Sequence, residues 1–267
     1  MIELDAEQAR RAIVEHTRRL AEAAAFSGPD CPIPTAAEWT ITDLVEHVGQ
    51  SQCWVAEIIE RRITDPTQLP TQMAVLPDDP AMWSAWLTES AQRIANACSD
   101  DAIDAPVFNA AADGRTGTQF WMCSALNEAV VHGFDAENAA GRPADIAPAI
   151  AAALIGNHLA MLTSPTWAMQ RPESAHAIRG TGETLQLRAT DTKDDTGSWF
   201  VELTPDGARW HPKTQQADVT VSGPAQSLLL IMTRRLSLDD QAGNHTSAEG
   251  DIELARHWIA NTPHVSG

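Results

Sequence analysis

The stretch NEAVVHGFDAE, residues 127–137, continues an apolar segment that starts at Phe120, and it places ionisable groups inside that segment. Aromatic and aliphatic residues fill most of the positions, as in a helix that is buried on nearly all sides. Glu128 and His132 stand four residues apart, which puts them on one face of this helix. A carboxylate in such surroundings is costly unless it is paired or bound to a cation. The stretch therefore predicts a buried polar site.

The segments around this stretch have the periodicity of amphipathic helices that are joined by long loops. The segment with Glu128 ends before Gly141, a residue type that is common directly after a helix. The expected helices cover about residues 5–25, 40–62, 80–97, 118–140 and 147–163. The first four of them predict a four-helix bundle.

The pattern changes after about residue 165, where short alternating segments rich in β-branched residues follow one another. The expected strands are AHAIRG (175–180), ETLQLRAT (183–190), SWFVELT (198–204), ARWHP (208–212) and ADVTVSG (217–223). Two further helices are expected in PAQSLLLIMTRRL (224–236) and DIELARHWIAN (251–261). We therefore expect a helical domain over residues 1–163 and a smaller α+β domain over residues 164–267.

Composition excludes several classes of partner. The net charge of -18 over 267 residues argues against nucleic acids and anionic membranes, because phosphate contacts need clustered Lys and Arg. No segment approaches the ~18 uninterrupted apolar residues of a membrane span. The N-terminal stretch MIELDAEQARRAIVEH lacks the layout of a secretion signal, and the four cysteines form no C-x-x-C pair. These features favour a cytoplasmic protein.

A third ligand-type side chain, His47, lies on the helix expected before this one. It shares an inward-facing stripe with Leu44, Ser51 and Trp54. His47, Glu128 and His132 could form a three-ligand metal site, and three protein ligands with one open position is the catalytic arrangement of zinc. The residues alone leave a second interpretation open, in which Glu128 and His132 form a buried ion pair and His47 is a core histidine. His158 is a fourth candidate, for which the pattern favours a place in the core.

Four motifs resemble one known family. EWTITDLVEHVGQ (38–50) and EAVVHGFDAENAAGRP (128–143) resemble the mycothiol-dependent maleylpyruvate isomerase family, whose members are DinB-like metalloenzymes. ADVTVSGPAQSLLLIMTRR (217–235) and AEGDIELARHW (248–258) resemble the second domain of that family. The resemblance implies an N-terminal DinB-like four-helix bundle followed by a smaller sterol-carrier-like α+β domain.

The resemblance also implies a set of site residues and cofactors. The family binds a divalent metal, usually zinc, through a His of the first motif and a Glu and a His of the second, which match His47, Glu128 and His132. An arginine of the second domain serves activity in the isomerase, and Arg234 or Arg235 could match it. Arg234 stands at the family's arginine position and is the expected catalytic residue, although Thr233 stands where many members have Gly. The cosubstrate implied is mycothiol.

The expected function is that of an enzyme which uses zinc to activate the thiol of mycothiol. A free thiol has a pKa near 8.5, and metal coordination deprotonates it. The thiolate would attack an electrophilic small molecule, either as an S-transferase or in a cis–trans isomerisation of the maleylpyruvate type. Two alternatives stay open: a non-catalytic small-molecule or lipid-binding protein with a structural metal, and metal-assisted hydrolysis with water in the open position.

Overall fold

The computed structural model describes residues 5–263, the side chains of residues 194 and 195 excepted. The chain divides into two compact units. The helical unit comprises Asp5–Ala110 and Gly114–Asp145, and the α+β unit comprises Ala111–Asp113 and residues 146–263 of the described chain. None of the helices in the described part is long and apolar enough to cross a membrane.

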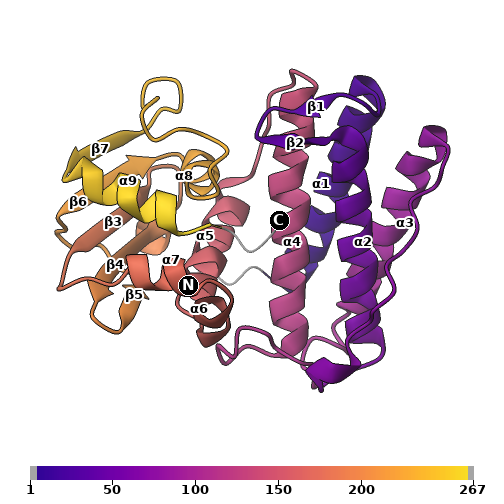
Figure 1. Ribbon diagram of the computed structural model, residues 1–267, viewed down its shortest axis with the longest axis horizontal. Helices are drawn as coiled ribbons and strands as arrows, with labels where there is room; N and C mark the ends of the chain where they lie inside the picture. The colour runs from indigo at the N-terminus through magenta and orange to yellow at the C-terminus, as the bar shows by residue number, and fades with distance from the viewer. Residues whose placement is uncertain (1–4, 264–267) are drawn as a thin grey trace. The chain divides into compact units, whose positions relative to one another are not determined.

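Four long helices make up most of the helical unit, and Figure 1 shows them side by side. They are α1 (Ala6–Ser27), α2 (Ile41–Glu60), α3 (Trp83–Ala97) and α4 (Gly117–Ala139), with short 3-10 turns at Pro66–Gln68 and Pro80–Met82. Helix α1 packs against α3 and α4, and α2 packs against the same two helices. The helical character expected from the sequence is confirmed, while its DinB-like topology stays a prediction.

Side-chain caps fix where the two site-bearing helices begin, and a glycine follows the end of α4. The hydroxyl of Thr40 accepts the backbone N–H of Asp43, and the carboxylate of Asp43 accepts the N–H of Thr40, so α2 starts with a capping box. Thr116 and Gln119 form the same arrangement at the start of α4. Gly141 follows α4 with a φ of 64°, a left-handed conformation that suits glycine. These caps fix the ends of the two helices, and the packing of α2 against α4 decides which of their side chains face each other.

A small antiparallel hairpin between α1 and α2 was not expected from the sequence. It consists of β1 (Pro32–Ile33) and β2 (Ala36–Thr40), and β1 contacts α4. Strands this short, with Pro32 in the first strand and Pro34 in the turn, show no alternating pattern that could distinguish them from a loop. Because Thr40 ends β2 and also caps α2, the hairpin leads directly into the helix that carries His47.

The α+β unit is built on a five-stranded sheet of order β5-β4-β3-β6-β7. Its strands are β3 (Thr184–Ala189), β4 (Ser198–Thr204), β5 (Gly207–His211), β6 (Val219–Gly223) and β7 (Ser247–Gly250), and all neighbours are antiparallel except β3 and β6. Helix α8 (Ala225–Met232) packs on β3 and β6, and α9 (Ile252–Asn261) packs on β6. Four expected strands and both expected helices are present.

One expected strand is wrong. AHAIRG (175–180) lies at the end of a short helix, α7 (Pro172–Ala177), which follows α6 (Pro165–Gln170). Each of these helices has a proline in its first turn, where the missing N–H and the fixed φ favour a helix start. The proline at position 172 therefore outweighs a weak alternation in the residues that follow.

Helix α5 (Pro148–Leu162) belongs to the α+β unit, although the sequence placed it in the first domain with a boundary after residue 163. Its packing against α8 explains this grouping. All residues of α8 except Gln226 are buried, so the helix needs cover on the side away from the sheet, and α5 supplies it. The backbone N–H of Ile146 also donates to Gln226 Oε1 at 2.7 Å.

We expect a fragment of residues 146–267 to unfold cooperatively, and a fragment of residues 164–267 to be much less stable. The shorter fragment exposes the face of α8 that α5 covers, and each buried aliphatic side chain contributes about 1.5–3 kcal/mol. Thermal unfolding followed by circular dichroism measures the difference. If the two fragments were equally stable, α5 would not be part of the α+β unit, and the domain boundary would lie after residue 163 as the sequence predicted.

Candidate metal centre

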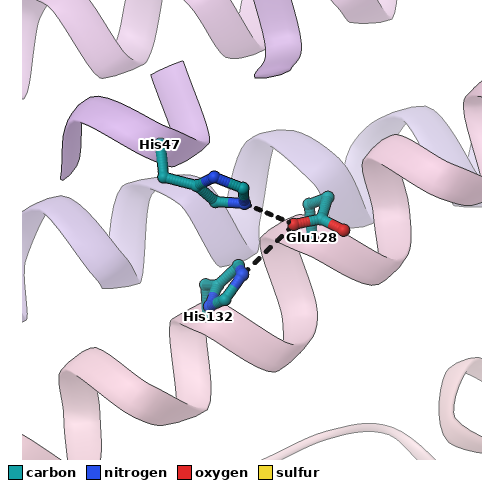
Figure 2. A group of neighbouring side chains, drawn as sticks. All are labelled: His47, Glu128 and His132. Carbon is teal, nitrogen blue, oxygen red and sulfur yellow. Dashed lines mark hydrogen bonds and ion pairs between the residues drawn. The ribbon is translucent and has the colours of Figure 1, made fainter. Parts of the chain in front are cut away.

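The structure brings together the three side chains that the sequence singled out. His47 comes from α2, and Glu128 and His132 come from α4 (Figure 2). His47 Nε2 lies 2.9 Å and His132 Nε2 lies 3.1 Å from the same oxygen, Glu128 Oε2. One ligand atom from each residue lies within 4.8 Å of the others. Their role as metal ligands stays a prediction.

Burial differs among the three side chains. The side chain of His132 is 6% exposed and that of Glu128 is 13% exposed, while that of His47 is 30% exposed. A depression of about 340 Å³ opens beside His47. It is lined by Glu38, Trp39, Asp43, Glu46, His47 and Gln50. A ligand in this depression can therefore contact the group from the His47 side.

Asp135 is a fourth member of the site that the sequence analysis missed. His132 Nδ1 lies 2.9 Å from Asp135 Oδ2, and the carboxylate of Asp135 is 1% exposed. Thr35, in the turn of the hairpin, donates its hydroxyl to Asp135 Oδ1 at 2.6 Å. A signal was present, because Asp135 is a second acid inside an apolar helix, three residues after His132 and on the same face.

Trp39 of β2 forms one side of the site, and it was also missed. Its indole ring stacks on the imidazole of His132 with centroids 5.8 Å apart and an interplanar angle of 19°. It meets the ring of His47 edge-on at 5.1 Å. Three aromatic rings from the hairpin, α2 and α4 therefore pack together beside Glu128.

The two carboxylates control the protonation of His132. Burial lowers the pKa of His132, but the hydrogen bonds to Asp135 and Glu128 together outweigh it and raise the pKa from 6.5 to about 9. With both histidines neutral, Glu128 and Asp135 would leave two negative charges in this partly buried site. A divalent cation would balance them.

The donor set fits a zinc ion. Two imidazole nitrogens and one carboxylate oxygen with an open position is a known catalytic arrangement for zinc, with bonds of about 2.0–2.2 Å. Tetrahedral geometry with such bonds separates ligand atoms by roughly 3.3 Å. The two spacings to Glu128 Oε2, 2.9 and 3.1 Å, are a few tenths of an ångström shorter, and all three ligand atoms lie within 4.8 Å of one another.

The other two candidate residues lie in the α+β unit. His158 is buried on α5, as the pattern favoured, and it is outside the cluster of ligand atoms. Arg234 follows the end of α8 with a φ of 62°, a conformation that costs a non-glycine residue about 1–2 kcal/mol. Burial and the positive charges of Arg171 and Arg235 lower the pKa of Arg234.

Comparisons with known proteins agree with the motifs. Residues 10–137 match the family model described as the mycothiol maleylpyruvate isomerase N-terminal domain. Residues 10–137 therefore form a domain of this family. Residues 166–260 match the SCP-2 sterol transfer family, so the resemblance inferred from the four motifs is confirmed for both parts of the chain. The mycothiol isomerase domain contains all three predicted metal ligands.

Similarities to solved structures are weak. A UbiJ-SCP2 ubiquinone synthesis protein is 17% identical and covers 43% of this chain and 91% of its own, with a TM-score of 0.30. The inverting sec-alkylsulfatase Pisa1 from Pseudomonas sp. is 14% identical with a TM-score of 0.34. That match covers 95% of this chain but 33% of the sulfatase, so the chain spans about a third of the sulfatase's length. No curated protein matches.

We expect the metal-free protein to lose stability as the pH rises. The pKa of His132 is about 9 in the folded protein against 6.5 for the ordinary group, so its contribution, up to about 3 kcal/mol, is complete below pH 6.5. It then declines and is absent above pH 9. Thermal unfolding with a chelator between about pH 6 and pH 10 measures it.

The matched control is His132→Gln, which lacks the titrating group. Its unfolding temperature should depend less on pH over the same range, because a glutamine cannot form the charged pair with Asp135 and Glu128. Parallel pH profiles for this variant and the wild type would contradict the raised pKa of His132.

Proposed function

We propose that the protein is a metal-dependent enzyme that uses mycothiol to attack an electrophilic small molecule. The observation that carries the proposal is the convergence of His47, Glu128 and His132 within a domain of the mycothiol maleylpyruvate isomerase family. The three residues would bind zinc, and mycothiol would be the thiol cosubstrate. The reducing cytoplasm is the compartment in which such a thiol enzyme would work.

Each residue of the site has a task in this proposal. His47, Glu128 and His132 would hold the ion, and a site with three protein ligands would still accept a thiol. Zinc bound there supplies the Lewis acidity that lowers the pKa of a thiol from its usual value of about 8.5. The depression beside His47 offers the cosubstrate a path from solvent, and the indole of Trp39 covers His132 from water.

Two reactions follow from the same activated thiolate. Attack on an activated double bond, rotation about the resulting single bond and expulsion of the thiolate give cis–trans isomerisation. Attack with loss of a leaving group gives an S-conjugate, the product of a transferase. Both reactions need the thiolate in the helical unit and a group that orients the electrophile.

We further propose Arg234 as the catalytic residue that orients the substrate. A guanidinium can bind a carboxylate through two parallel hydrogen bonds. The presence of an arginine in a left-handed position, where glycine would be unstrained, supports a role for its side chain. The nearby charges of Arg171 and Arg235, which lower its pKa, make this end of α8 attractive to anions.

The SCP-2 match favours a second candidate, a non-catalytic carrier of lipids or other apolar molecules. The apolar space between the sheet and helices α8 and α9 measures about 10 Å³. Pockets that bind lipids or other organic molecules usually have volumes of several hundred Å³. This described space is too small for such a ligand, which supports the enzyme over the carrier.

We expect His47→Ala and His132→Ala to lose most of the bound zinc while keeping the helical content. Each variant has two ligands left, too few for a tight zinc site. Metal analysis and circular dichroism measure both properties. Calorimetry with mycothiol should then give binding heat for the zinc-loaded wild type and none for either variant.

The matched control is His16→Gln, which alters a buried histidine of α1 outside the group. It should keep its zinc. Stoichiometric zinc in both alanine variants would show that the ligands are wrongly assigned. A wild type that binds apolar ligands regardless of metal, and does not bind mycothiol, would establish the carrier instead.

We expect Arg234→Ala to keep its zinc and its fold but to lose about tenfold in turnover efficiency, the effect of about 1.4 kcal/mol in transition-state binding. Arg234→Lys should recover only part, because lysine lacks the planar fork. Steady-state kinetics measure the loss, with Arg188→Ala, an exposed arginine of β3, as control. Unchanged kinetics for Arg234→Ala would assign this arginine a surface role.

A further inference from the structure

We propose that Asp135, held in place by Thr35 of the hairpin, is the residue that positions His132 for metal binding. The inference rests on the proposed function, because it assigns a task toward the same zinc site. Asp135 and Thr35 are not among the three predicted ligands. Their contacts connect the hairpin β1–β2 with α4.

The two nitrogens of His132 have different neighbours. Nδ1 lies 2.9 Å from Asp135 Oδ2, and Nε2 points to Glu128 Oε2 at 3.1 Å. An ionised carboxylate only accepts hydrogen bonds, so the contact with Asp135 requires a hydrogen on Nδ1. This selects the form of the neutral ring in which the lone pair is on Nε2, the atom that faces Glu128 and His47.

Asp135 is itself fixed on its other side. Its carboxylate is 1% exposed, and its second oxygen accepts the hydroxyl of Thr35 at 2.6 Å. Thr35 lies between β1 and β2, so the orientation of the carboxylate depends on the hairpin as well as on α4. The carboxylate of Asp135 therefore links the hairpin to the imidazole ring of His132, so that the hairpin helps to set the orientation of the ring.

The same hairpin restrains the face of the ring. Trp39 of β2 stacks on His132 at 5.8 Å with an angle of 19° between the planes. Asp135 fixes the ring at Nδ1 and Trp39 fixes it at the face, so rotation about the Cβ–Cγ bond would break both contacts. The ring is thus held with Nε2 toward the other two ligand atoms before any ion binds.

Glu137, two residues after Asp135 on α4, is a buried acid that contacts none of the predicted metal ligands in the interactions described. It is 7% exposed, and its carboxylate accepts a hydrogen bond from Arg19 Nε at 2.8 Å. Asp135 instead uses one oxygen for a metal-ligand candidate and the other for the hairpin. Glu137 is therefore the matched control for a buried acid of α4 that does not serve the site.

The experiment compares zinc affinity in the full-length protein by competition with a chromogenic chelator. Asp135→Ala should lower zinc affinity about 10–100-fold, the usual effect of removing such a partner of a ligand. Asp135→Asn should lose less, because its amide oxygen can still accept from Nδ1. Thr35→Val should show a smaller loss than Asp135→Ala, and Glu137→Gln should keep the wild-type affinity.

A spectroscopic measurement separates positioning from a general loss of structure. In the zinc-loaded wild type with ¹⁵N-labelled histidine, the Nδ1–H proton of His132 should be protected from solvent exchange. It should exchange freely in Asp135→Ala, and in Glu137→Gln it should stay protected. If Asp135 had only a structural role, Asp135→Ala would have a lower unfolding temperature, but the Nδ1–H proton of His132 would stay protected from exchange.

The outcomes distinguish this inference from the function on which it rests. A folded Asp135→Ala with wild-type zinc affinity overturns the positioning role and leaves the zinc site intact. A wild type that binds no zinc overturns both. If the Asp135 variants do not fold, Thr35→Val decides: weaker zinc binding with a normal fold supports the role, and unchanged binding refutes it.

Discussion

One oxygen atom, Glu128 Oε2, has an imidazole nitrogen from each of two helices within 3.1 Å, and the surrounding structure is arranged around this contact. A carboxylate in an apolar helix needs such partners, because water cannot solvate it fully there. The capping boxes of α2 and α4 determine where each helix starts, and the packing of the two helices brings His47 to face Glu128. The burial of Glu128 is therefore tolerated only in this register of α2 against α4.

The sequence revealed this contact because a charge in an apolar helix is an anomaly that can be seen without a structure. Glu128 and His132 stood out for that reason, and the stripe of His47 pointed to the same interior. Thr35 and Trp39 could not be found in this way. They lie on a hairpin whose strands are too short to show a period, and their contacts with α4 depend on how the hairpin folds back over the helix.

The same limit explains the placement of α5. Periodicity identified a helix over residues 147–163 within about one residue at each end, because an apolar stripe is a local property. The core in which this stripe is buried depends on a helix far along the chain, α8. Here α8 is buried at every residue except Gln226 and needs a second cover, so α5 joins the α+β unit instead of the preceding helices. Local patterns therefore predicted elements better than boundaries between units.

The site has a property that an ordinary buried ion pair does not need. Two acids, Glu128 and Asp135, flank His132 from opposite nitrogens, which raises its pKa to about 9 and keeps the ring doubly protonated at neutral pH in the absence of metal. A single acid would suffice to pair one imidazolium. With two acids, the proton on Nε2 of His132 occupies the place that a cation would take. The proton on Nδ1 remains on the ring and is donated to Asp135. The exchange of the Nε2 proton for a divalent ion improves the charge balance with little movement of the side chains, which is the behaviour expected of a preorganised metal site.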